Sequence, residues 1–239
     1  MSAWKTEWWD GGVALATPLA WRGVEAQHVV ATLRLVDTAA EQDLLEQLIE
    51  GSKPALPTTP GTPNDQPPKH HLLTTPFRDS PEHESRFHPR RAKGQWYRAE
   101  ALQVACAEVA WWRHRFVLDS AGLIDQELLT EHTFFQAAIA GPAIDLMAPP
   151  WNAERFTWTH GSNYTATRAL AQAATPRGVH WLAYESACAP GGRCAVALTP
   201  DCLSEPPDGL ERSMLTWHCK ATKGAVLFTR GRERYGWAF

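Results

Sequence analysis

The chain has 239 residues, of which 44% are hydrophobic and 12 are tryptophan, and its formal net charge at pH 7 is −3. This apolar and aromatic content is enough for a substantial buried core, which excludes a largely disordered chain. The slightly acidic balance argues against a protein that coats nucleic acid or a membrane through its overall charge, although a local basic patch stays possible.

The start of the chain does not read as a targeting segment. Residues 1–10 contain Lys5, Glu7 and three tryptophans, where a signal would need a basic start and an apolar run. No stretch approaches the roughly 18 apolar residues of a membrane-spanning helix, so we expect a soluble, cytoplasmic protein. The five cysteines form no CxxC pair, which predicts reduced thiols and no metal site.

The first organised unit is expected at residues 24–51. Residues 29–36 read as a strand, and Thr38 and Glu41 have the spacing of a capping box that opens a short helix. Four apolar residues at helical spacing are expected to form the buried stripe of this helix: Leu44, Leu45, Leu48 and Ile49.

The segment after this helix is rich in proline. Residues 53–69 hold six prolines among Thr, Asn, Asp and Gly, a composition that favours an extended, weakly packed connection. We therefore place the main boundary here, with an N-terminal extension at residues 1–69 and the main domain at residues 70–239. The extension could cover a site, mediate dimerisation or bind a protein partner.

Beyond this segment the pattern alternates between helix and strand. One helix is expected over residues 99–116, and another, capped by Ser162 or Asn163, is expected to run to Ala174. Five apolar stretches are expected to be strands: 133–140, 179–185, 193–199, 215–219 and 225–229. This alternation predicts an α/β (α+β) fold, in which helices flank a sheet.

The helix at residues 99–116 carries a carboxylate on its apolar face. On a 3.6-residue period, Glu108 shares this face with small apolar residues before it and with Trp111 and Trp112 after it. A glutamate in such surroundings must be paired and hydrogen-bonded, or its pKa must rise. Arg86, Tyr97 and Ser186 are candidate partners; a structural ion pair, or a helix edge that reaches water, is the alternative.

The loop before this helix is basic and aromatic. Five cations fall within 13 residues beside Trp96 and Tyr97, namely Arg86, Arg90, Arg91, Lys93 and Arg98. Arginine forks bind phosphate oxygens and aromatic faces stack on planar rings, so a dinucleotide and single-stranded nucleic acid both fit. A solvated loop whose arginines meet nearby acids is the plainer alternative.

Several short motifs together resemble the RES domain family, which is named for an arginine, a glutamate and a serine. The resemblance extends over about residues 72–203 and rests on Thr75-Pro76-Phe77-Arg78, Ser85-Arg86-Phe87, Gly94-Gln95-Trp96-Tyr97, Ala107-Glu108-Val109-Ala110, Asp145–Pro150, Tyr184-Glu185-Ser186 and Gly191-Gly192. The order and spacing of these motifs are similar to those of the family.

This resemblance implies an ADP-ribosyltransferase-like α/β fold, with a mixed or split β-sheet core and flanking helices, that uses NAD+ as substrate and needs no further cofactor. By motif position, Glu108 would stabilise positive charge near the ribose, and Arg86 would hold the pyrophosphate or a phosphate acceptor. Tyr97 would stack on a ring, and Ser186 would hydrogen-bond the ribose or the nicotinamide amide. Arg78 matches a further arginine that would bind substrate.

The family also implies a biological setting. Its members are often toxins of bacterial toxin–antitoxin pairs that degrade NAD+ with phosphate or water as acceptor, so we expect an NAD+ phosphorylase or glycohydrolase. The implied partners are NAD+ and an Xre-like helix-turn-helix antitoxin, with a homo-oligomer possible and no direct contact with nucleic acid or membrane. A protein ADP-ribosyltransferase with the same site is the alternative, and a nucleic-acid-binding module comes third.

Overall fold

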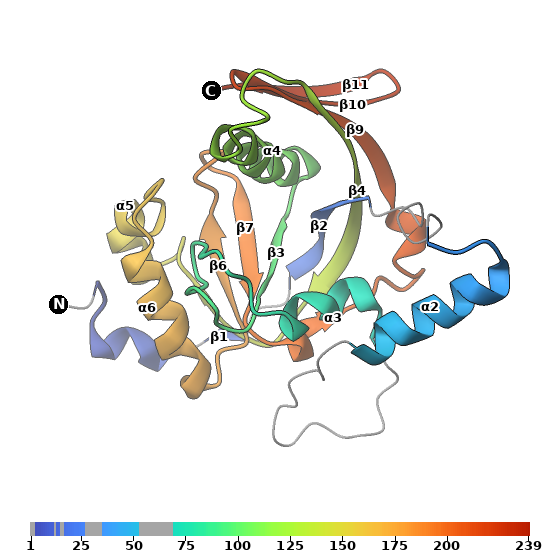
Figure 1. Ribbon diagram of the computed structural model, residues 1–239. Helices are drawn as coiled ribbons and strands as arrows, with labels where there is room; N and C mark the ends of the chain where they lie inside the picture. Colours follow the sequence, from blue (N-terminus) through green and yellow to red (C-terminus); the bar gives the residue numbers. More distant parts are fainter. Residues whose placement is uncertain (1–2, 12, 15–16, 27–34, 53–68) are drawn as a thin grey trace.

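A computed structural model of the chain describes residues 3–11, 13–14, 17–26, 35–52 and 69–239. In these residues, eleven strands form one mixed sheet with flanking helices (Figure 1). The expected α/β class is therefore confirmed. Most of the strand expected at 29–36 and nearly all of the proline-rich segment lie outside the described residues.

The sheet continues from one edge to the other in the order β1 (Val13–Ala14), β5 (Pro142–Asp145), β6 (Trp181–Glu185), β7 (Arg193–Ala197), β3 (Trp96–Ala99), β2 (Thr17–Glu25), β4 (Leu128–Ile139), β9 (Leu215–Ala221), β10 (Ala225–Arg230) and β11 (Glu233–Ala238). The short β8 (Leu203–Ser204) pairs with β4 outside this order. β5 and β6 run parallel, whereas the other described pairs are antiparallel. The five expected strands are confirmed as β4, β6, β7, β9 and β10.

β2 joins the two halves of this sheet. It pairs with β3 on one side, where Trp21 lies opposite Ala99, and with β4 along most of its length on the other. The local pattern did not predict this strand. The division into an extension and a main domain stays a prediction, but two strands from residues 1–69 belong to the same sheet as the rest of the chain.

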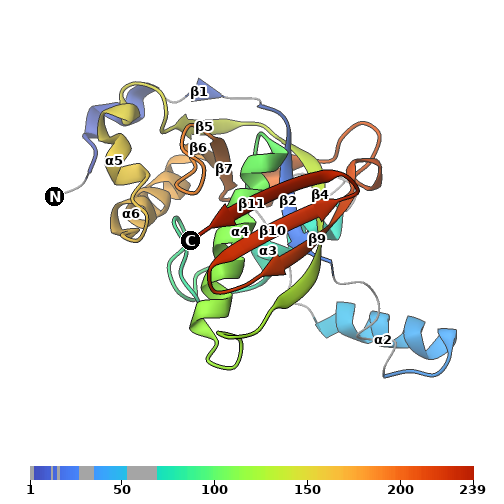
Figure 2. The same ribbon diagram turned by 90° about the horizontal axis from the view of Figure 1, so that it is seen from above.

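The long helix α4 (Leu102–Asp119) lies inside the curve of the sheet. It contacts β2 and β3 on one side and β9, β10 and β11 on the other, and β9–β11 pass over it in Figures 1 and 2. Ala105, Cys106 and Ala110 are buried in the core that this arrangement encloses. The expected helix is confirmed, and it begins three residues later than predicted because residues 96–99 form β3.

Two further helices cover other parts of the sheet. α3 (His71–Arg78) packs Leu73 and Phe77 into a second core on the opposite face from α4. α6 (Thr165–Ala174) contacts the short α5 (Arg155–Trp158). The expected cap of α6 is confirmed in part, because the Asn163 side chain accepts a hydrogen bond from the backbone N–H of Thr165 while Tyr164 occupies the cap position.

α2 (Ala39–Ser52) confirms its predicted start and contradicts its predicted packing. Glu41 accepts hydrogen bonds from the backbone N–H groups of Asp37 and Thr38, and the Thr38 hydroxyl accepts one from the backbone N–H of Glu41. The expectation that its apolar stripe is buried is wrong, since 56% of Leu44 and 63% of Leu48 are exposed. A periodic stripe shows where a helix could pack, but not whether the fold supplies a surface there.

The loop that leads into β3 is held against α3. The backbone N–H of Gly94 donates to the carbonyl of Asp79 at 2.9 Å. A Cβ atom added to Gly94 would overlap the carbonyl oxygen of Pro76. Only glycine therefore permits this approach of two backbone segments, and the approach sets where the loop enters β3.

We expect Gly94→Ala to destabilise the protein by about 1–3 kcal/mol, as overpacking of a filled site does. Gly122→Ala is the matched control, because a Cβ at Gly122 would meet nothing within 4 Å. Melting temperatures of the two variants and the parent measure the effect. Equal melting temperatures for the two variants would contradict the close packing of this loop on α3.

Candidate active site

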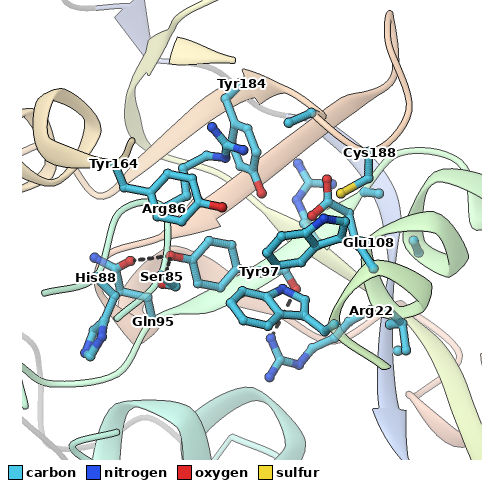
Figure 3. A pocket seen from close by; sticks show the side chains of 18 of the residues that line it. Arg22, Ser85, Arg86, His88, Gln95, Tyr97, Glu108, Tyr164, Tyr184 and Cys188 are labelled. Atoms are coloured by element: carbon cyan, nitrogen blue, oxygen red, sulfur yellow. Dashed lines mark hydrogen bonds between the residues drawn. The ribbon is translucent and has the colours of Figure 1, made fainter. Parts of the chain in front are cut away.

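A cavity of about 380 Å³ lies between α4, the centre of the sheet and the loops that precede β3 and follow β6 (Figure 3). This volume is in the range of pockets that bind small molecules. Three of the five site residues expected from the sequence line the cavity, namely Arg86, Tyr97 and Glu108. Ser186 lies directly behind Glu108, and Arg78, in the last turn of α3, is not among the lining residues.

Glu108 projects from the middle of α4 into the cavity. Its Oε1 accepts a hydrogen bond from Ser186 Oγ at 2.5 Å, and the Cys194 thiol lies 4.0 Å from the same oxygen. Burial raises the pKa of Glu108 above its ordinary value, while the Ser186 hydrogen bond and the charge of Arg86 act in the opposite direction. The carboxyl group is thus fixed in position, and the ionised form is disfavoured by its surroundings.

Ser186 follows the last residue of β6 and is 1% exposed. Its oxygen accepts hydrogen bonds from the backbone N–H groups of Cys188 and Ala189, at 3.1 and 3.0 Å. The single O–H group of Ser186 donates its hydrogen bond to Glu108. The hydroxyl therefore cannot donate a hydrogen bond to a ligand at the same time. This geometry favours a role in holding Glu108 over the direct contact with ribose or nicotinamide that the family resemblance suggested.

The loop that holds Ser186 is fixed by an ion pair at the end of β6. Arg155 donates to both carboxylate oxygens of Glu185 at 2.6 Å, and the backbone N–H of Gly191 also donates to this carboxylate. The hydrogen bonds with Arg155, its charge and the Gly191 N–H lower the pKa of Glu185, so it stays ionised. Glu185 therefore orders the turn on which Ser186 lies.

Arg86 is positioned by backbone carbonyl groups. Its Nη1 donates to the carbonyls of Trp158 and His160, at 2.9 and 3.0 Å, and its guanidinium lies 4.9 Å from the centre of the Tyr164 ring. These partners carry no negative charge. The positive charge is therefore available to an anion in the cavity.

Tyr97 places its ring on the cavity wall and turns its hydroxyl into a hydrogen-bond network. The hydroxyl donates to Gln95 Oε1, accepts from the backbone N–H of Phe87 and shares a hydrogen bond with Ser85. Burial raises the pKa of Tyr97 to about 12. The phenol stays protonated, and its ring rather than its hydroxyl faces a ligand.

Arg22 on β2 lines the same cavity, although local sequence patterns did not predict it as a site residue. Its Nη1 donates to the carbonyl of Tyr97 at 3.1 Å, whereas its Nε is buried and has no hydrogen-bond partner among the described residues. Desolvation lowers the pKa of Arg22 to about 10. Its guanidinium lies 5.2 Å from the centre of the Trp96 ring. An arginine inside the apolar stretch that precedes Val24 was the available signal, but no local pattern placed it in the same cavity as Glu108.

The cations of the basic loop fall into two groups, because Arg86 and Arg98 line the cavity and the other three do not. Arg90, Arg91 and Lys93 are exposed and are not among the residues that line the cavity. Arg90 instead donates to the backbone carbonyl of Glu82. The basic loop is therefore divided between the cavity and the solvent-exposed surface.

Cys188 also lines the cavity, beside Glu108. Burial and the neighbouring carboxylate raise the pKa of its thiol to about 12. The thiol therefore stays protonated at neutral pH, and a thiolate nucleophile is not supported.

The described part of the chain has neither a membrane-spanning helix nor a group of metal-binding side chains. None of its helices has both the length and the apolar character to cross a membrane. Within the same residues, no three or more His, Cys, Asp and Glu side chains are grouped so as to hold a metal ion.

The fold and the cavity define an α/β protein in which a fixed carboxyl group lies in a cavity that three arginines, Arg22, Arg86 and Arg98, also line. The sequence profile of the RES domain matches residues 62–218 of the 239, and the chain therefore belongs to the RES domain family. A comparison with curated proteins gave no match. Among solved structures, the chain is similar to one from the crystal structure of the M. tuberculosis MbcT–MbcA toxin–antitoxin complex, with 10% identity, a TM-score of 0.47, and coverage of 89% of this chain and 87% of that chain.

The raised pKa of Glu108 predicts that this residue lowers stability at neutral pH. A carboxyl group with a higher pKa in the folded state contributes stability below its unfolded value, near 4.5, and loses that contribution as pH rises through the folded pKa. We therefore expect Glu108→Gln to melt a few degrees above the parent at neutral pH, with the difference shrinking as pH falls.

Thermal unfolding of the two proteins across this pH range measures the effect. Glu82→Gln is the control, because Glu82 is exposed and lies outside the cavity. A melting temperature of Glu108→Gln below that of the parent at neutral pH would contradict a disfavoured carboxylate.

Proposed function

We propose that this protein consumes NAD+ by cleaving the bond between nicotinamide and ribose, with phosphate or water as the acceptor. The observation that carries the proposal is the carboxyl group of Glu108, which Ser186 holds at 2.5 Å on the wall of a cavity that Arg22 and Arg86 also line. Membership of the RES domain family supports the same activity.

The chemistry requires negative charge at one point and positive charge at another. As the nicotinamide leaves, the ribose acquires oxocarbenium character, and a carboxylate fixed nearby stabilises charge that exists mainly in the transition state. Glu108 would have this role in its ionised form. Its fixed position means that no rearrangement is needed when the charge develops.

The two arginines suit the other end of the substrate. Arg86 is held by neutral carbonyls, and Arg22 lies over the Trp96 ring with a buried Nε that has no hydrogen-bond partner in the described part of the chain. A pyrophosphate, or the phosphate acceptor, would supply the negative charge that these guanidiniums lack. The ring of Tyr97 would pack against the ribose or a ring of the substrate.

In the cell, we propose that the protein is the toxin of a toxin–antitoxin pair. Family membership supports this role, and an Xre-like helix-turn-helix antitoxin would be the protein partner. The same site would also serve a protein ADP-ribosyltransferase, which differs in its acceptor. The reaction products decide between these activities.

We expect the purified protein to deplete NAD+ and release nicotinamide, and Glu108→Gln to reduce the rate by about a hundredfold or more, as the loss of a main electrostatic group does. Reactions with and without phosphate, analysed by chromatography, identify the acceptor, and labelled NAD+ detects transfer to protein. Glu82→Gln should keep full activity. Full NAD+ turnover by Glu108→Gln would refute the proposed mechanism.

We expect Ser186→Ala to move the acid limb of the pH–rate profile to higher pH. The Ser186 hydrogen bond favours the ionised form of Glu108, so its loss raises the pKa of the carboxyl group. The pH dependence of kcat/KM measures this shift, with Ser204→Ala, at an exposed position of β8, as control. A lower rate with an unmoved acid limb would contradict this role of Ser186.

A further inference from the structure

Two tryptophans follow Glu108 along α4 and line the same cavity. Trp111 and Trp112 lie three and four residues after Glu108, which places them about 4.5–6 Å further along the helix axis on the same face. Their ring centres are 4.8 Å apart and their planes meet at 87°. The two indoles therefore form a corner, which we call the tryptophan corner, one helical turn from the carboxyl group.

Packing inside the protein does not account for Trp112. The residue is 46% exposed, although tryptophan is normally among the most buried residues by area. Phe116, one turn further along α4, is 49% exposed and does not line the cavity. The tryptophan corner thus differs from this neighbouring aromatic residue in facing the cavity.

We infer that the tryptophan corner binds the nicotinamide ring of NAD+; this inference rests on the proposed function. If Glu108 acts beside the ribose whose bond is cleaved, the ring bonded to that ribose lies within about one helical turn of the carboxylate. The adenine is joined through the pyrophosphate and a second ribose, so it lies farther away. The geometry of α4 therefore assigns the corner to nicotinamide.

The positive charge of the nicotinamide ring explains why two tryptophans would bind it. Nicotinamide in NAD+ is a cation, and an indole face is the aromatic surface that attracts cations best. Arg22 and Arg86 line the same cavity and would repel a cationic ring. The ring is therefore most stable beside the electron-rich indoles and Glu108.

Cleavage removes this attraction. When the bond between the ring nitrogen and ribose C1′ breaks, the electron pair goes to the nitrogen and nicotinamide leaves as a neutral molecule. The acceptor oxygen then forms the new bond to C1′, and a proton from water or phosphate passes to solvent. The corner therefore holds the charged substrate ring more tightly than the neutral product.

The test measures binding in a variant whose turnover of NAD+ is strongly slowed. In the Glu108→Gln background, we expect Trp112→Ala to weaken binding of NAD+ and of nicotinamide mononucleotide about tenfold, the size expected for one cation–aromatic contact that excludes water. ADP-ribose, which lacks nicotinamide, should bind as before. Isothermal titration with the three ligands measures these constants.

Matched variants separate the tryptophan corner from the rest of the helix. Phe116→Ala removes an equally exposed aromatic residue outside the cavity and should change none of the constants. Trp111→Phe keeps an aromatic ring at the partly buried position and should have a smaller effect than Trp112→Ala. Melting temperatures confirm that each variant is folded.

Two results would overturn the inference. If Trp112→Ala weakens NAD+ and ADP-ribose but not nicotinamide mononucleotide, the corner binds adenine. If no ligand is affected, the corner is not a ring subsite. Absence of NAD+ turnover by the parent protein, with NAD+ still bound through Trp112, would instead refute the proposed function and leave the ring subsite standing.

Discussion

The hydrogen bond between Ser186 and Glu108 connects the two parts of the structure on which the candidate site depends. Glu108 comes from the helix inside the curved sheet, and Ser186 comes from the turn after β6, 78 residues later. The backbone N–H groups of residues 188 and 189 and the ion pair of Glu185 with Arg155 hold that turn. The carboxyl group is thus held from both sides before any ligand binds, as electrostatic preorganisation requires.

The same arrangement leaves opposite charges poorly compensated within the cavity. Burial disfavours the ionised form of Glu108, and it also disfavours the charged form of Arg22, whose pKa is lowered to about 10. Neither group forms an ion pair with the other among the described contacts. A ligand that is cationic at one end and anionic at the other would relieve both costs. Buried groups whose charged forms are disfavoured are typical of binding sites, where they lower the stability of the folded protein and favour the bound ligand.

Local sequence patterns were sufficient to predict part of the fold and part of the candidate site. The helical period put Glu108 on an inward face, and the family motifs brought Arg86, Tyr97 and Ser186 to its neighbourhood. Local patterns did not predict β2 or the place of Arg22 in the site. β2 pairs with β4, which lies more than a hundred residues later, and such a pairing leaves no local signal in the sequence. The patterns also failed for the packing of α2, in which Leu44 and Leu48 have helical spacing but face solvent, and Arg78 is not among the residues that line the cavity. Periodicity describes one element at a time, whereas a site depends on which elements meet.

The central place of β2 has a consequence for how the chain acquires its fold. Both of its partners come later in the chain, at residues 96–99 and 128–139. Until the ribosome has released β4, β2 has no partner for most of its length. Long-range pairings of this kind raise contact order and slow folding. The cavity, which takes a wall from β2, therefore forms only after β4 has been made.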